Sequence, residues 1–187
     1  MDGDLVLVDA GCELNGYASD ITRTFPINGK FSKAQEAVYE IVLEANKERI
    51  KTVKKDLTPD ETEKKAIEII TQGLVDLSIL NGELNELIEK GAYRDFYMHR
   101  VGHWMGMDVH DVGSYGLNGK WRKYSPGMIT TIEPGIYFKE NLKNVPEEYL
   151  NIGIRIEDDV LVTEGDPEVL TSSVPKTIIE IEKVMGS

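Results

Sequence analysis

Two aspartates, Asp9 and Asp20, flank a turn-like segment near the start of the chain. The runs 5–9 and 17–25 are rich in β-branched and aromatic residues, which is typical of strands, and the residues between them favour a turn. A four-residue loop over 13–16 would place Asp9 directly opposite Asp20. Like charges so placed repel, so we expect a bound group that neutralises them.

All three histidines of the chain, His99, His103 and His110, fall within one short stretch. His99 and His103 would share a face if this stretch were helical, but Gly102 and Gly106 indicate close backbone packing instead. A single histidine is usually an ordinary core or surface residue. Three together beside glycines favour a functional site.

Two glutamates lie at strand-like positions in the second half of the chain. Glu133 ends an apolar run and precedes Pro-Gly, which leaves its carboxylate at the edge of a strand. Arg155 and Glu157 alternate with isoleucines and therefore share one face of a strand. The ordinary interpretations are a solvated glutamate before a turn and an exposed ion pair.

Taken together, these residues form a set of four carboxylates and one imidazole: Asp9, Asp20, His103, Glu133 and Glu157. Carboxylates gathered in a cleft raise one another's pKa and destabilise the fold unless cations neutralise them. Two divalent ions would balance the four negative charges. This oxygen-rich set suits Mn²⁺ better than a thiolate-type zinc site would, with Co²⁺, Zn²⁺ or Fe²⁺ as alternatives.

Helix signals precede the glycine-rich and strand-rich part of the chain. Capping boxes at Ser32 and at Thr58 predict two amphipathic helices, the second ending at Asn81-Gly82, and a short helix should follow over 83–91. Strands are predicted within 128–138, 152–163 and 177–182. This order favours an α+β fold in which helices pack on an antiparallel sheet.

The composition and net charge of the chain limit the classes of partner that it can bind. The chain has 33 acidic and 21 basic residues, a formal net charge of −12, and 41% hydrophobic residues. With no basic cluster, this charge disfavours nucleic acid and anionic membranes as partners. The single Cys12 excludes an internal disulfide and, with no apolar run long enough for a membrane span, indicates a cytoplasmic protein.

Four motifs in order, "VDAG…GYASDITRTFP", "MHRVGHWMGMDVHDVG", "TIEPGIY" and "IRIEDD", closely resemble those of the bacterial Xaa-Pro aminopeptidases (aminopeptidase P). These belong to the pita-bread metallopeptidases, family M24, which also include prolidases and methionine aminopeptidases. The resemblance runs from about residue 3 to residue 182. It implies a pita-bread fold, an antiparallel sheet flanked by helices.

The resemblance also implies a dinuclear metal site. Asp9 would chelate one ion, Asp20 and Glu157 would bridge both, and His103 and Glu133 would complete the other. A hydroxide held between the ions would attack the bond before a proline, so the expected partners are peptides with proline in the second position. Ions about 3.5–4 Å apart activate water and stabilise the oxyanion in such sites.

Further roles follow from the same resemblance. Glu133 would pass a proton to the leaving nitrogen, and His99 and His110 would contact substrate, with His110 donating to the oxyanion. Arg155 would orient Glu157.

Two features depart from the family. Arg100 stands where a small residue is frequent. Family members also carry an N-terminal domain and the first elements of the catalytic domain, so we expect residues 1–187 to be a C-terminal catalytic part, incomplete at its N-terminus, with an unfilled sheet edge near 5–8. The full-length protein is expected to be a homo-oligomer. The alternative functions are a prolidase and a non-catalytic peptide-binding module of the same fold.

Overall fold

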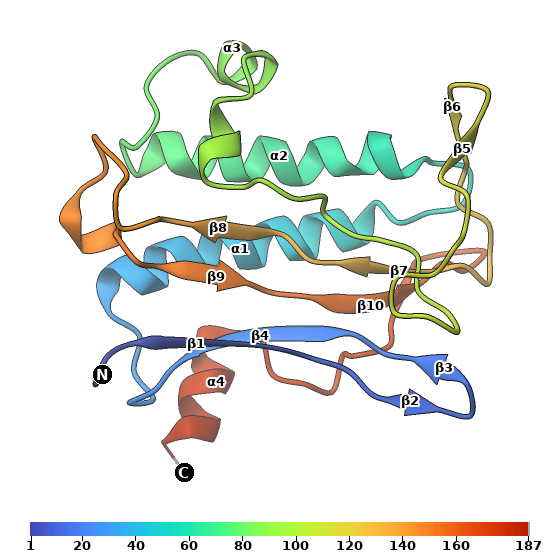
Figure 1. Ribbon diagram of the computed structural model, residues 1–187, viewed down its shortest axis with the longest axis horizontal. Helices are drawn as coiled ribbons and strands as arrows, with labels where there is room; N and C mark the ends of the chain where they lie inside the picture. The colour runs from blue at the N-terminus through green and yellow to red at the C-terminus, as the bar shows by residue number, and fades with distance from the viewer. Residues whose placement is uncertain (187) are drawn as a thin grey trace.

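The computed structural model describes residues 1–186, and Figure 1 shows a sheet-like layer with the long helices on one side and the C-terminal helix on the other. The α-helices are α1 (Lys33–Lys51), α2 (Pro59–Asp76), α3 (Leu84–Glu89) and α4 (Ile178–Met185), with short 3₁₀ helices η1 (Ala92–Asp95) and η2 (Glu147–Tyr149). The strands are β1 (Leu5–Ala10), β2 (Glu13–Leu14), β3 (Tyr17–Ala18), β4 (Ile21–Pro26), β5 (Gly116–Leu117), β6 (Lys120–Trp121), β7 (Ile129–Ile132), β8 (Gly135–Tyr137), β9 (Gly153–Arg155), β10 (Asp158–Leu161) and β11 (Glu168–Val169). The α+β prediction is confirmed. Within residues 1–186, no helix has the length and apolarity to span a membrane.

The N-terminal hairpin differs from the predicted register. β1 pairs antiparallel with β4, and β2 and β3 continue the same ladder to a two-residue turn at Asn15-Gly16. Both turn residues have positive φ, 54° and 83°, as a type I′ hairpin turn requires. The shorter loop shifts the pairing by two residues, so Asp9 faces Thr22. The prediction that Asp9 lies directly opposite Asp20 was therefore wrong; the two are diagonal neighbours on the same face.

A second, longer hairpin crosses the middle of the molecule. β7 pairs with β10 and β8 pairs with β9, and the two ladders keep one register: Ile132 faces Asp158 and Gly135 faces Arg155. Pro134 interrupts the ladder because it has no N–H to donate. The residues on either side of the interruption continue the register, which places Glu133 opposite Glu157.

Cross-links hold the two hairpins together at this level. The Glu157 N–H donates to the Thr22 carbonyl at 3.1 Å. The Thr24 hydroxyl donates to the Arg155 carbonyl at 2.9 Å and accepts from the Arg155 N–H at 3.1 Å. β4 therefore lies alongside the second hairpin, and the side chains of both hairpins converge on one site.

Helix α1 packs against β7, β8 and β9, and α2 packs on α1 (Figure 1). The buried Asn46 of α1 donates from its amide to the Ile132 carbonyl at 3.1 Å and to the Ile156 carbonyl at 3.4 Å. These carbonyls immediately precede Glu133 and Glu157. Helix α1 thus fixes both strands at the point where the ladder is interrupted.

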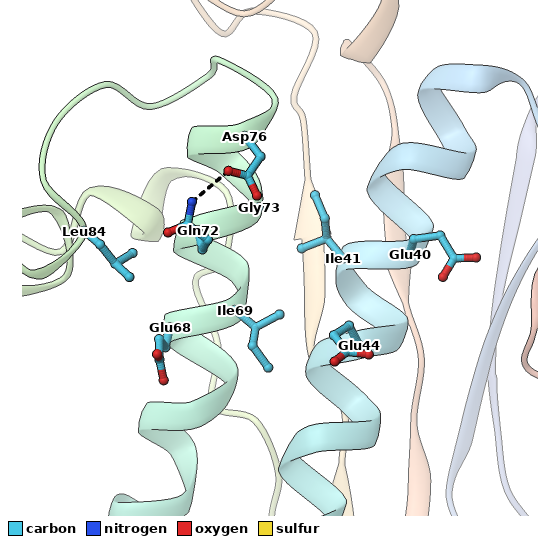
Figure 2. Close-up of a pocket in the computed structure, with 9 residues that line it drawn as sticks. All are labelled: Glu40, Ile41, Glu44, Glu68, Ile69, Gln72, Gly73, Asp76 and Leu84. Atoms are coloured by element: carbon cyan, nitrogen blue, oxygen red, sulfur yellow. Dashed lines mark hydrogen bonds between the residues drawn. The ribbon is translucent and has the colours of Figure 1, made fainter.

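The two long helices approach closely at Gly73. A Cβ at this position would lie 2.6 Å from the Ile41 side chain, so only glycine allows this spacing. A groove of about 420 Å³ lies between them. Figure 2 shows Ile41 and Ile69 facing each other across this groove and acidic side chains along its edges.

Both predicted capping boxes are present, at Ser32 with Gln35 and at Thr58 with Glu61. Helix α2, however, ends at Asp76, earlier than the predicted stop at Asn81-Gly82. Ser78 adopts a positive φ of 59°, and the N–H groups of Ser78 and Ile79 bond back to the last turn. This is a Schellman motif with serine at the left-handed position that glycine usually occupies. The prediction placed the helix end at Asn81-Gly82 because it relied on glycine as the stop signal.

The C-terminal segment corrects another prediction. Residues 177–182 were predicted as a strand, but they begin helix α4, with a capping box at Thr177 and Glu180 and with Ile181 buried. The run is short, and its alternating isoleucines and glutamates fit either period. The capping box decides for the helix.

A buried ionic cluster joins this segment to the sheet. Asp158 is 0% exposed and accepts from Arg23 at 2.9 Å, from Lys176 at 2.6 Å and from Thr171 at 2.7 Å. Its pKa is lowered because Lys176 and Arg23 outweigh the cost of burial. Lys176 also donates to Asn46 at 2.8 Å, so the cluster reaches the helix that fixes the interrupted ladder.

Removing this carboxylate should leave Arg23, which is buried, and Lys176, which is half-buried, without their shared counter-ion. We expect Asp158→Ala to lower the free energy of unfolding by about 3–5 kcal/mol, measured by denaturant titration in chelator. The control is Asp166→Ala, whose ion pair with Lys54 is exposed and should contribute little. Equal losses in the two variants would contradict a structural role for the cluster.

Candidate metal centre

One cavity, of about 620 Å³, collects every site residue that the sequence indicated. Its lining residues are Asp9, Asp20, His99, Arg100, Gly102, His103, His110, Asp111, Tyr115, Glu133, Arg155 and Glu157. The residues come from β1, from the approach to β4, from the histidine segment and from both strands of the second hairpin. The fold therefore brings together groups that are distant in the sequence.

The histidine segment is extended alongside β7, not helical. The Thr131 N–H donates to the His103 carbonyl at 2.9 Å, and the His103 N–H donates to the Thr131 hydroxyl at 3.1 Å. A Cβ on Gly102 would lie 1.9 Å from the Thr131 carbonyl oxygen. The prediction of close backbone packing is confirmed at Gly102, where only glycine fits; at Gly106 the close neighbour of a Cβ is the Asp111 side chain, at 2.2 Å.

The His103 ring has one nitrogen available to a ligand. Its Nδ1 lies 3.1 Å from the Trp104 carbonyl oxygen, which can only accept, so Nδ1 carries the proton. The lone pair of Nε2 then points toward Asp20 Oδ2 at 3.5 Å and Glu133 Oε1 at 3.6 Å. A carbonyl that fixes the histidine tautomer is typical of metal ligands.

Three of these groups lie close enough together to hold one metal ion. One ligand atom from each of Asp20, His103 and Glu157 lies within 4.8 Å of the others. Asp20 is 8% exposed and Glu157 is 2% exposed. The Asp20 N–H donates to Asp159 Oδ2 at 3.1 Å, which holds the residue in place.

The opposed glutamates are strongly perturbed. Burial, reinforced by Glu133 and Asp20, raises the pKa of Glu157 to about 8, although the Thr22 hydroxyl donates to it at 2.6 Å. Burial raises the pKa of Glu133 to about 7 against the opposing effect of Arg155. Burial and the adjacent Asp9 also raise the pKa of Asp20. Added positive charge is what such a cluster favours.

His99 and His110 flank the carboxylates. His99 Nε2 lies 2.8 Å from the Tyr137 hydroxyl and its Nδ1 lies 2.8 Å from the Arg100 carbonyl. Burial lowers the pKa of His99 and of His103, which favours neutral rings. The His110 ring meets His103 edge-on, with centroids 4.2 Å apart.

Arg155 contacts a different carboxylate from the one expected. Its guanidinium bonds Asp9, and its Nε donates to the Thr22 hydroxyl at 3.1 Å. Thr22, in turn, donates to Glu157. Among residues 1–186, Arg155 thus reaches Glu157 through Thr22 instead of directly.

Sequence reasoning missed the residues that support these groups. Thr22 lies two positions from Asp20 on β4, and Asp159 lies two from Glu157, so strand alternation could have placed each beside its neighbour. Tyr137 contacts His99 from β8. No local pattern predicts this long-range contact.

Residues 1–164 match the model of metallopeptidase family M24. The chain belongs to this family. Its members carry divalent metal ions, and the donor set fits such ions: carboxylates gathered with raised pKa values beside an imidazole with a bare nitrogen. The fold is accordingly the pita-bread fold that the sequence predicts.

The M24 chain is similar to curated Xaa-Pro aminopeptidases. It is 55% identical to that of Haemophilus influenzae over 99% of this chain and 43% of the relative, and 50% identical to that of Escherichia coli over 98% and 41%. It therefore spans about two fifths of the length of these relatives. Among solved structures, the Pseudomonas aeruginosa aminopeptidase PepP superposes with a TM-score of 0.97 at 54% identity, covering 99% of this chain and 42% of that one. A zinc-substituted E. coli aminopeptidase P in complex with product gives 0.95 at 50% identity, covering 99% and 42%.

The raised pKa values predict how pH acts on the metal-free protein. The pKa values of Glu133 and Glu157 are raised in the folded protein from their usual value of 4.5, so the contribution of these two groups to stability is greatest below pH 4.5 and is lost as pH rises toward 8. Histidines with lowered pKa oppose this only below about pH 6.5. We therefore expect the unfolding midpoint in chelator to fall between pH 6.5 and 8.

The matched variant is Glu157→Gln, which should flatten this decline, and Mn²⁺ should raise the wild-type midpoint most at high pH. The exposed Glu164, changed to glutamine, should retain the decline. A wild-type midpoint that rises over this interval would contradict the assignment.

Proposed function

We propose that this chain carries the catalytic site of a metal-dependent Xaa-Pro aminopeptidase, which removes an N-terminal residue that precedes proline. The observation that carries the proposal is the convergence of Asp20, His103 and Glu157, with Glu133, on one point of a single cavity. The named relatives at 50–55% identity support the same activity. We assign residues 1–187 to the catalytic domain.

The proposed ligands of two divalent ions are Asp9, Asp20, His103, Glu133 and Glu157, with Mn²⁺ the expected ion and Co²⁺, Zn²⁺ or Fe²⁺ as alternatives. When bound, the ions would supply an activated water nucleophile and polarise the scissile carbonyl. The bare Nε2 of His103 and the buried carboxylates support this assignment.

The other side chains would bind substrate and move protons. Glu133, whose pKa is raised to about 7, is suited to accept a proton and deliver it to the leaving nitrogen near neutral pH. His110 would donate to the developing oxyanion, and His99, fixed by Tyr137, would contact the peptide. Arg155 would orient Asp9 directly and Glu157 through Thr22.

The substrate class has a chemical rationale. The bond before proline is a tertiary amide, and proline offers no N–H to a peptidase that requires this donor. A prolidase would act on the same bond in dipeptides only. The retention of all five donor residues argues against a non-catalytic peptide-binding module. We further propose that the protein is a cytoplasmic homo-oligomer.

The metal assignment predicts that some substitutions remove metal and activity together, whereas others lower activity and leave the metal bound. In the full-length protein, Glu157→Gln should reduce bound Mn²⁺ below two ions per chain and abolish cleavage, because it removes the negative charge of one proposed ligand. His110→Ala should keep the metal and lower kcat about 10²–10³-fold, as loss of one oxyanion donor does. Metal analysis and steady-state kinetics measure both, with Glu164→Gln as the exposed control.

Peptide length separates the two candidate activities. The proposed aminopeptidase should cleave longer peptides with proline in the second position as well as the dipeptide. Cleavage of the dipeptide alone would replace the proposal with a prolidase. Equal metal content in wild type and Glu157→Gln would refute the proposed ligand set.

A further inference from the structure

Arg100 stands in the wall of the cavity that holds the candidate metal centre. It lines this cavity together with Asp20, Glu133 and Glu157, and its side chain is exposed. It also lines two neighbouring hollows. The guanidinium is therefore at the open side of the site, within reach of a molecule that enters it.

Two aromatic rings hold this side chain. The Arg100 Cζ lies 5.6 Å from the centroid of the Tyr115 ring and 5.6 Å from that of Trp121. Tyr115 is itself fixed, because its ring stacks on Trp104 at 5.5 Å and its hydroxyl accepts the Trp104 N–H at 2.9 Å. Cation–π contacts thus position the guanidinium before any ligand arrives.

These ring contacts do not occupy all the N–H donors of Arg100. The planes of the two rings are 83° apart, so at most one ring can stack on the flat face of the guanidinium, which has five N–H donors in its plane. Within residues 1–186, the guanidinium has ring contacts and no ion pair. The other guanidinium of the cavity, that of Arg155, is already engaged by Asp9 and Thr22. Arg100 is the one of the two that is free to bind another anion.

Negative and positive charges lie at different places in the cavity. Asp20, Glu133 and Glu157 form an acidic floor, and Arg100 places a cation in the wall. A peptide carries an ammonium group at its start and a carboxylate further along. The acidic floor favours the ammonium end, and a planar guanidinium with free donors matches a carboxylate in two parallel hydrogen bonds.

We propose that Arg100 is a specificity residue that binds a carboxylate on the part of the peptide that follows the scissile bond. This inference rests on the proposed function and adds a substrate class to it: short peptides with a free C-terminus, or peptides with an acidic residue after proline. Both sources offer the same ligand chemistry.

Matched peptides test the inference in the Mn²⁺-loaded full-length protein. One pair is alanyl-prolyl-alanine and its C-terminal amide; the other is alanyl-prolyl-glutamate amide and alanyl-prolyl-glutamine amide. Arg100→Gln should raise KM about tenfold for the charged member of a pair, with kcat little changed and the neutral member unaffected. Arg100→Lys should fall between, because it keeps the charge and loses the planar fork.

The control is Arg94→Gln, which removes an exposed arginine that also contacts a ring, that of Tyr93 at 5.9 Å, outside the metal cavity. It should change neither pair. A loss confined to the first pair assigns the C-terminal carboxylate, and one confined to the second assigns the acidic side chain. Equal effects on charged and neutral peptides, or none, would overturn the proposal.

Calorimetry separates this result from the fate of the proposed function. The product dipeptide prolyl-alanine and its amide are not cleaved, so their binding is measurable whether or not the protein is a peptidase. Wild type should bind the acid about tenfold more tightly than the amide, and Arg100→Gln should abolish the difference. Absence of cleavage would refute the proposed function, whereas equal binding of acid and amide by wild type would refute the role of Arg100.

Discussion

The burial of opposed carboxylates is the constraint on which this structure depends. Glu133 and Glu157 face each other across an interrupted ladder, and Asp20 enters the same space from the other hairpin. Burial raises the pKa of all three, so the fold holds them close at an electrostatic cost. Such a cost is characteristic of functional sites, where the stability of the surrounding structure maintains an unfavourable arrangement until a ligand relieves it.

Hydrogen-bonded polar groups beside the carboxylates hold this arrangement in place. Asn46 fixes the two carbonyls beside the interruption, and Lys176 links this amide to the buried Asp158. Asp158 belongs to the same run of acids as Glu157, yet its pKa is lowered, because cations surround it. Neighbouring carboxylates thus have opposite environments: Asp158 is neutralised by cations, and Glu157 is buried with a raised pKa.

Much of this could be predicted from sequence because the signals are local. Capping boxes located α1 and α2, and the site residues that the motifs indicated all line one cavity, although Asp111, which also lines it, was not among them. The errors have physical causes. The register of the first hairpin depends on two positive φ angles at Asn15-Gly16. The segment that forms α4 is too short for its hydrophobic pattern to distinguish a helix from a strand, and its capping box is the signal that identifies the helix. The contact of Arg155 with Asp9 could not be predicted, because it joins two hairpins whose packing no local pattern encodes.

Because the long hairpin keeps one register, the alignment of Glu133 with Glu157 does not depend on the length of the loop that connects the two strands. Glu133 and Glu157 are aligned by backbone pairs on both sides of Pro134, so the mostly exposed connection over 139–148 can be lengthened or replaced without altering how the two glutamates meet. The buried residues that flank it have to be kept: Phe138, Tyr149 and Ile152. A residue inserted into β9 or β10 would instead turn alternate side chains to the opposite face. Natural variation should accordingly be tolerated in the loop and eliminated from the strands, and the loop is the place where a new binding element can be grafted.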